Sequence, residues 1–353
     1  MGNWENNIRK VVPYTPGEQP NQTDMIKLNT NENPYPPSPK VQKIIDGFDA
    51  QQLRLYPDPE VSELIAAIAK NKGLDKEQVF VGVGSDDVLA MSFLTFFGSE
   101  QPILFPDITY SFYDVWAELF RIPYEQIPLQ EDFRICVDDY KRKNGGIVIP
   151  NPNAPTGIAE SLDAIEEIIA ANPDSVVIID EAYVDFGTKS AQELLKTYEN
   201  LLVVQTFSKS RSLAGSRIGY AMGSKKLIAY LNDCKYSFNS YTMDRLTIQE
   251  GKASMEDEPY FTEQVHRIIE TREWAKEQLK KLGFDFPDSK ANFIFARHKE
   301  IAAEDIFAAL KQRNIYVRYF KKPRIDNYLR ITIGTKEEME QLMNALQEIL
   351  QVA

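Results

Sequence analysis

Between about residues 60 and 210, apolar positions follow two alternating patterns, and each predicts a different kind of element. Short continuous apolar runs predict buried strands at 79–83, 102–105, 146–149, 176–179 and 201–204. Apolar residues three and four positions apart predict amphipathic helices at 61–68, 86–97, 113–120 and 162–169. Strands that are apolar on both faces and alternate with helices are typical of a mostly parallel sheet with helices on both faces. The pattern therefore predicts an α/β fold for this part of the chain.

The pattern changes after about residue 245, where the elements suggest a smaller α+β unit. They are a long helix ending at Gly283, a strand at 292–296, a helix at 303–313 and extended segments around Val317 and 329–331. A final helix begins with the capping box of Thr335 and Glu338. We expect three parts: an N-terminal arm at 1–40, a large cofactor-binding domain at 41–245 and a small C-terminal α+β domain at 246–353.

Composition narrows the class of protein. The net charge of −12 argues against a nucleic-acid partner, which would need a clustered basic face. No stretch approaches the ~20 apolar residues of a membrane span, and residues 1–10 lack the apolar core of a signal peptide. Cys136 and Cys234 have no metal-like spacing, which indicates reduced thiols in a cytoplasmic protein. Two histidines exclude a multi-histidine metal site, so we expect no metal.

The segment at 206–219, which follows a predicted strand, carries the most informative side chain. Lys209 leaves a buried strand end among hydroxyl residues, where burial and a second cation would lower the pKa of its amine. Such a lysine can form an imine with an aldehyde cofactor. Arg217 could pair bidentately with a phosphate, and Ser208 and Thr206 would add neutral donors. The alternative interpretation is a solvated basic loop.

A second candidate is Asp180, at the end of the apolar strand predicted at 176–179. An acid there is expensive to bury unless it meets a cation. The protonated ring nitrogen of pyridoxal phosphate (PLP) is such a cation, and the proton makes the ring an electron sink. Tyr183 could reach the phenolic oxygen of the same ring. The alternative role for Asp180 is a helix N-cap.

Three further segments follow predicted strands, where α/β sheets place their ligands. The turn Gly84-Ser85-Asp86 offers backbone N–H groups and a helix dipole to a phosphate, although Ser85 could equally be a plain N-cap. Tyr110 could stack on a cofactor ring or could be another core aromatic. Asn153 lies in a turn at 151–157 whose side-chain amides would face the same crevice.

Taken in order, these motifs resemble the fold-type I PLP-dependent aminotransferases, and within them the histidinol-phosphate aminotransferase family. The resemblance covers nearly the whole chain, and the ordered set carries it rather than any single motif. The matching motifs are Leu28-Asn29-x-Asn31-Glu32-Asn33-Pro34, Leu55-Tyr56-Pro57-Asp58-Pro59, Gly84-Ser85-Asp86, Asp180-Glu181-Ala182-Tyr183, Ser208-Lys209 with Arg217, and Leu329-Arg330-Ile331-Thr332-Ile333-Gly334.

The resemblance implies roles for individual residues. Lys209 is similar to the lysine that holds PLP as a Schiff base and moves the substrate's proton, with Asp180 at the ring nitrogen and Tyr183 at the phenolic oxygen. The expected cofactor-binding set is Lys209, Ser85, Asp86, Tyr110, Asn153, Asp180, Tyr183, Thr206, Ser208, Arg217 and Tyr56. Tyr56 resembles a tyrosine that reaches the phosphate in a neighbouring subunit, which implies a homodimer.

The substrate's anionic end is expected near Tyr14, Asn31, Arg318 and Arg330. Both arginines sit in apolar extended segments, where a guanidinium is costly without an anion. The alternative is a structural ion pair with one of the many acids.

The chain departs from the family pattern at Ala154, where the family has an asparagine that donates to the phenolic oxygen of PLP. Asn153 could substitute for it, or Tyr183 could serve alone.

The resemblance implies transamination from L-histidinol phosphate to 2-oxoglutarate, in histidine biosynthesis. The alternatives are an aromatic amino-acid aminotransferase, a threonine-phosphate decarboxylase and, remotely, a PLP-sensing DNA-binding regulator.

Overall fold

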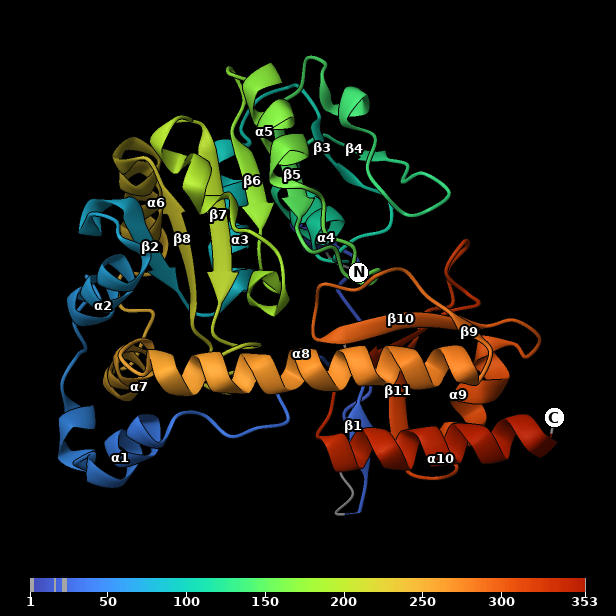
Figure 1. The fold of residues 1–353 in the computed structure, drawn as a ribbon. Helices are drawn as coiled ribbons and strands as arrows, with labels where there is room; N and C mark the ends of the chain where they lie inside the picture. The colour runs from blue at the N-terminus through green and yellow to red at the C-terminus, as the bar shows by residue number, and fades with distance from the viewer. Residues whose placement is uncertain (1–2, 16, 21–23, 353) are drawn as a thin grey trace.

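Two sheets organise the chain in the computed structural model, which describes residues 3–15, 17–20 and 24–352 (Figure 1). The larger sheet has the order β2-β8-β7-β6-β5-β3-β4. Its strands are β2 (Val79–Gly82), β3 (Ile103–Pro106), β4 (Tyr124–Ile127), β5 (Gly146–Pro150), β6 (Val177–Asp180), β7 (Leu201–Thr206) and β8 (Gly219–Gly223). Neighbours from β7 to β4 run parallel, whereas β8 runs antiparallel to both β7 and β2.

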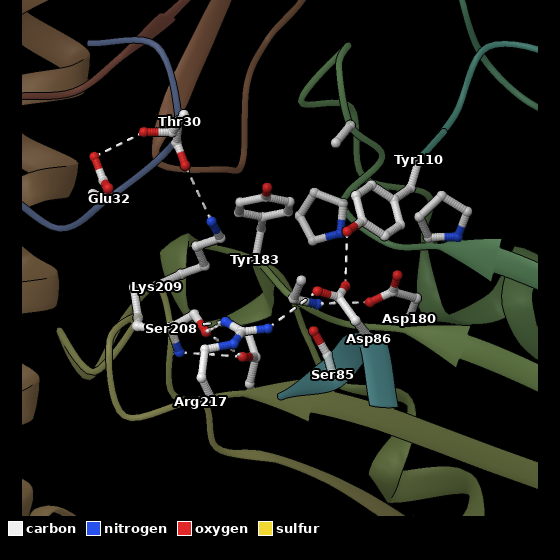
Figure 2. Close-up of a pocket in the computed structure, with 16 residues that line it drawn as sticks. Thr30, Glu32, Ser85, Asp86, Tyr110, Asp180, Tyr183, Ser208, Lys209 and Arg217 are labelled. Carbon is white, nitrogen blue, oxygen red and sulfur yellow. Dashed lines mark hydrogen bonds and ion pairs between the residues drawn. The ribbon is translucent and has the colours of Figure 1, made fainter. Parts of the chain in front are cut away.

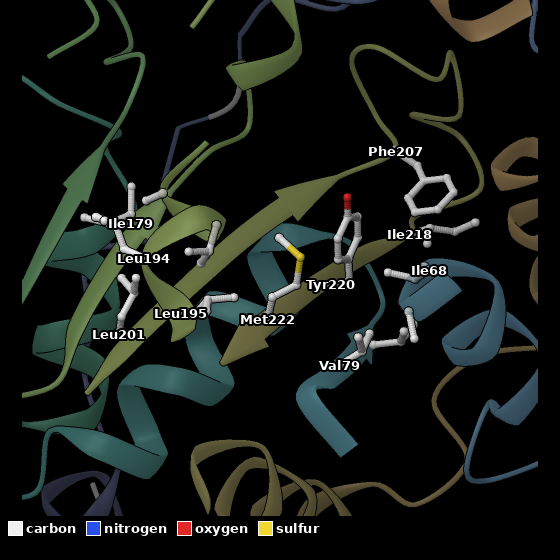
Figure 3. Close-up of a cluster of buried hydrophobic side chains, with 14 of the residues drawn as sticks. Ile68, Val79, Ile179, Leu194, Leu195, Leu201, Phe207, Ile218, Tyr220 and Met222 are labelled. Carbon is white, nitrogen blue, oxygen red and sulfur yellow. The ribbon is translucent and has the colours of Figure 1, made fainter. Parts of the chain in front are cut away.

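The central strands bury side chains on both faces, as their continuous apolar runs predict. In β5, Ile147 and Ile149 belong to the core on one face, while Val148 belongs to the core on the other. The first core is closed by α2 (Ser62–Lys72), α5 (Leu162–Ala171) and α7 (Arg245–Met255) (Figure 3). The second core is closed by α3 (Ser85–Phe96), α4 (Tyr113–Phe120) and α6 (Lys225–Phe238). The predicted α/β fold, mostly parallel and covered on both faces, is confirmed.

The smaller sheet has the order β1-β11-β12-β10-β9 and its own core. Its strands are β1 (Ile26–Leu28), β9 (Phe284–Asp285), β10 (Phe293–His298), β11 (Ile315–Tyr319) and β12 (Leu329–Thr332). The helices α8 (Glu258–Lys281), α9 (Ala303–Lys311) and α10 (Lys336–Val352) pack on it, and α8 extends back past the larger sheet (Figure 1). The predicted capping box is present, because Thr335 N donates to Glu338 and Glu338 N donates to Thr335 Oγ1.

The segment expected as an ordered arm supplies β1, which pairs in parallel with β11 near the other end of the chain. A short helix, α1 (Pro39–Gly47), follows the arm. The chain has further elements that the apolar pattern did not predict, among them β8, α6 and α7. The proposed division at residues 40 and 245 stays an interpretation of the chain. Among the described residues, no helix is both long and apolar enough to span a bilayer.

Candidate functional site

One cavity collects the residues that follow the carboxyl ends of the large sheet's strands (Figure 2). This placement is a consequence of the topology, because parallel strands end at the same edge of a sheet. The predicted cofactor residues that line the cavity are Ser85, Asp86, Tyr110, Asp180, Tyr183, Thr206, Ser208, Lys209 and Arg217. Segments far apart in the sequence are therefore brought together at one point.

Lys209 extends into this cavity from the loop after β7. Its Nζ lies 3.3 Å from the carbonyl oxygen of Thr30, to which it donates. Burial lowers the pKa of the amine to about 8, with a contribution from the positive charge of Arg330, while the charge of Glu32 opposes the shift. The unprotonated, nucleophilic form of this amine is therefore much more populated near neutral pH than that of an ordinary lysine.

Asp180 ends β6 almost completely buried, with 5% of its surface exposed. Oδ2 accepts a hydrogen bond of 2.7 Å from the hydroxyl of Tyr113, and Oδ1 accepts one of 3.2 Å from the backbone N–H of Ala182. Burial raises the pKa of Asp180 to about 6, although both hydrogen bonds favour the charged form. Within the described residues Asp180 forms no ion pair, so a cation in the cavity would relieve the cost of burying it.

The other end of the cavity is suited to a phosphate. Helix α3 begins after Gly84 with no side-chain cap, which leaves first-turn N–H groups available to an anion. Arg217 closes over this turn, since a Cβ at Gly84 would lie 2.4 Å from its Nη2. Arg217 also donates to Ser208 Oγ over 3.4 Å and pairs with Asp86 over 3.1 Å.

The two acids of this turn have separate partners. Asp87 accepts from the backbone N–H of Val83 at 2.8 Å, so it stabilises the turn rather than facing the cavity. Asp86 bridges Arg217 and the hydroxyl of Tyr110, which donates to it over 2.7 Å. Asp86 thus connects the residue expected under the cofactor ring with the one expected at its phosphate.

The N-terminal arm forms one wall of the cavity through Thr30 and Glu32. Asn31 lies behind them, and its amide donates to the hydroxyl of Tyr183 over 2.9 Å. Asn33 donates to the carbonyl oxygens of Lys209 and Ser210, which holds the arm against the lysine loop. The arm therefore positions both Tyr183 and Lys209.

The expected substrate residues lie beside the cavity. Tyr14 and Arg318 line an adjoining groove, and the ring of Tyr14 stacks on Phe112 at 4.2 Å. Arg330 donates to the carbonyl oxygen of Asn29 over 2.9 Å, while its buried Nε has no partner among the described residues. Among the described residues, neither Arg318 nor Arg330 forms an ion pair with a carboxylate.

Two predicted cofactor residues do not line the cavity. The Asn153 amide donates to the carbonyl oxygen of Ile108, in the loop after β3, and to Thr156 Oγ1 in its own turn, so its N–H groups are already engaged. At the family's asparagine position, Ala154 does line the cavity. Tyr56 is 78% exposed and contacts Tyr241, so its hydroxyl is available to another molecule.

The sequence pattern did not identify Thr30, Glu32 or Tyr113. Thr30 and Glu32 belong to a motif that was recognised, but nothing in the motif itself shows which side chains face inward. Tyr113 was assigned only to a helix, although its place three residues after Tyr110 at a helix start was an available signal.

Comparisons with known proteins show the family to which the chain is similar. The sequence model of the family described as "Aminotransferase class I and II" matches residues 23–346. A histidinol-phosphate aminotransferase of Lactococcus lactis subsp. cremoris is 55% identical over 98% of both chains. One from Acinetobacter baylyi is 54% identical over 97% of this chain and 96% of its own length.

Solved structures show the same fold at lower sequence identity. The histidinol-phosphate aminotransferase from Clostridium acetobutylicum superimposes with a TM-score of 0.86 at 22% identity, covering 93% of this chain and all (100%) of that one. The enzyme from Sinorhizobium meliloti, in complex with pyridoxal-5'-phosphate, has a TM-score of 0.84 at 22% identity, covering 93% of this chain and 91% of its own. These likenesses establish the arrangement of the elements.

Proposed function

The chain belongs to the class I and II aminotransferases, and from that premise we propose that it transfers the amino group of L-histidinol phosphate to 2-oxoglutarate. The products are imidazole acetol phosphate and glutamate, a step of histidine biosynthesis. The observation that carries the proposal is the identity of 52–55% to histidinol-phosphate aminotransferases over 98% of the chain.

The enzyme depends on pyridoxal 5'-phosphate, and the cavity fits this group. When bound, PLP supplies an aldehyde for the substrate's amine and a ring that accepts electrons from the substrate. The uncapped start of α3 and Arg217 suit the phosphate, and the buried Asp180 suits a protonated ring nitrogen. Tyr110 would lie against the ring, and Tyr183 would donate to its phenolic oxygen.

Lys209 would transfer the substrate's proton during the reaction. Its amine, with a pKa of about 8, would hold the cofactor through its aldehyde carbon and would take the proton from the substrate's Cα. Thr30 and Asn33 hold this side chain and its loop against the arm. Tyr183, whose hydroxyl is fixed by Asn31, completes the catalytic group.

The same two arginines, Arg318 and Arg330, would bind the phosphate of one substrate and a carboxylate of the other. Arg330 supports this role because its buried Nε lacks a partner among the described residues, which costs free energy until an anion arrives. The alternative of a structural ion pair has no support from any carboxylate in the described part of the chain. Tyr14, from the N-terminal arm, would contact the same anionic group beside Arg318.

We also infer a homodimer in which Tyr56 completes the partner's phosphate site. The exposed ring of Tyr56 supports this, since no hydrogen bond within the described part of its own subunit uses its hydroxyl. The backbone beside it is held by Arg245, which donates to the Tyr56 carbonyl oxygen over 2.7 Å. Free thiols at Cys136 and Cys234 support a cytoplasmic location.

Turnover with 2-oxoglutarate tests the assignment directly. Histidinol phosphate should be the preferred amino donor, compared with phenylalanine, tyrosine and threonine phosphate at equal concentration. Preference for an aromatic amino acid would move the chain to the aromatic aminotransferases. Release of carbon dioxide from threonine phosphate would instead make it a decarboxylase.

A further inference from the structure

Tyr113 is a fully buried side chain that hydrogen-bonds the acid expected at the cofactor's ring nitrogen, and the proposed reaction gives it no role. It begins helix α4, and its hydroxyl lies 2.7 Å from Asp180 Oδ2 at the end of β6. This hydrogen bond thus links the start of the helix to the end of the strand.

The phenol donates in this contact, because an ionised carboxylate has no proton to offer. Burial, together with the charge of Asp180, raises the pKa of Tyr113 well above its ordinary value, so the hydroxyl keeps its proton. A donor stabilises the charged form of a carboxylate and disfavours its protonation. Tyr113 therefore opposes the effect of burial on Asp180 and keeps the acid available as an anion.

The ring of Tyr113 is fixed by packing, so its hydroxyl has a defined direction. It contacts Phe105 edge-on at 5.7 Å, Phe93 at 6.1 Å and Tyr110 at 5.8 Å between ring centroids. With Tyr113 on Oδ2 and the Ala182 N–H on Oδ1, each carboxylate oxygen has one donor and retains further acceptor capacity.

We propose that Tyr113 is a positioning residue, whose phenol holds the Asp180 carboxylate ionised and aimed at the cofactor's ring nitrogen so that the proton stays on that nitrogen. The inference rests on the proposed function. Without the phenol, Asp180 becomes the stronger base, and the shared proton moves from the ring nitrogen toward the carboxylate. The other ionisable groups that face Asp180 are Asp86, Tyr110 and Tyr183, and none of them donates to it.

Tyr113→Phe removes the donor and keeps the aromatic packing. Tyr140→Phe is the matched control, because Tyr140 is as deeply buried and its hydroxyl has no partner among the described residues. The proteins are loaded with PLP carrying ¹⁵N in its ring, and ¹⁵N NMR follows the protonation of that nitrogen with pH. Amino-group transfer is measured on the same samples.

In Tyr113→Phe the ring nitrogen should lose its proton at a lower pH than in the wild type. Turnover should fall about 10-fold or more, the lower end of what one hydrogen bond to a charged group contributes. Tyr140→Phe should change neither quantity. If PLP-loaded Tyr113→Phe matches Tyr140→Phe in both, this inference is overturned. If the wild type binds no PLP, it is the proposed function that fails.

A second pair of variants guards against misfolding of the phenylalanine protein. Tyr113→His keeps a ring with an N–H donor, whereas Tyr113→Met has none, and the histidine protein should keep its ring nitrogen protonated to higher pH. Equal titrations of the two would contradict the inference. In an Asp180→Asn background, Tyr113→Phe should have no further effect on the ¹⁵N titration, because the residue acts through the acid.

Discussion

Arg318 and Arg330 stand directly opposite each other in the antiparallel pair formed by β11 and β12. Residues at such positions point to the same face of a sheet, and like charges there destabilise the pair. Both guanidinium groups also lie against the ring of Phe320, at 5.4 and 5.5 Å from its centroid. Burial and the charge of Arg318 lower the pKa of Arg330, which is the electrostatic cost of this arrangement. An anionic group of the substrate would remove that cost.

Arg330→Lys should therefore discriminate between phosphorylated and unphosphorylated donors. Lysine keeps the charge but loses the planar two-point contact, so KM for histidinol phosphate should rise roughly 10-fold or more. KM for histidinol should change much less. Arg297→Lys is the control, because Arg297 is an exposed arginine of the neighbouring strand β10. Equal changes for both donors would show that Arg330 does not bind the phosphate.

Lys209 should be the only lysine that PLP modifies. Borohydride reduction of the PLP-loaded protein should fix the cofactor to the peptide that contains Lys209, and the visible absorption band should disappear. Lys235 is an internal control, since it is also buried and burial also lowers its pKa, but it donates to Pro59 away from the cavity. Label on Lys235, or on any other lysine, would contradict the assignment.

The rate at which PLP combines with the cofactor-free protein should depend on pH through Lys209. An amine is a nucleophile only when unprotonated, so the rate should rise about tenfold per pH unit below the pKa of about 8 and level off above it. Stopped-flow absorbance between pH 6 and 9.5 measures this. A rate that continues to rise to pH 9.5 would mean that the free amine has an ordinary pKa.

The role of Tyr56 in the partner's site can be tested by mixing two variants, each of which has little or no activity by itself. If Tyr56 serves the partner's site, a heterodimer of Tyr56→Phe and Lys209→Ala subunits carries both lesions in one site and leaves the other intact. The heterodimer should have about half of the wild-type activity, so an equal mixture, in which about half of the dimers are heterodimers, should recover about a quarter. Lys209→Ala mixed with wild type gives the reference for one intact site. Verified subunit exchange without recovery would place Tyr56 in its own subunit's site, and full activity of Tyr56→Phe alone would show that it serves no site.

Local signals in the sequence were sufficient for most of the fold and for the cofactor side of the site. Continuous apolar runs and the helical spacing of apolar residues depend only on neighbouring residues, which is why β5, β6, β7 and α5 were predicted at nearly their observed bounds. Lys209 and Asp180 were identifiable because each is a charged residue directly after an apolar strand. Strand β8 was missed because its Gly219 and Gly223 ends and small residues give no apolar run.

Tertiary structure decided the features that depend on long-range contacts. No local pattern indicates that Tyr113 meets Asp180, that Thr30 accepts from Lys209, or that Arg318 faces Arg330. Asn153 shows the same limit, since its amide donates to the distant carbonyl oxygen of Ile108 although its position beside the missing asparagine suggested the cofactor. A sequence determines which chemical groups are present and which stretches must be buried, because these properties depend on composition and on the spacing of apolar residues along the chain. The direction of a buried polar side chain depends on how separate elements pack, so only the folded chain determines it.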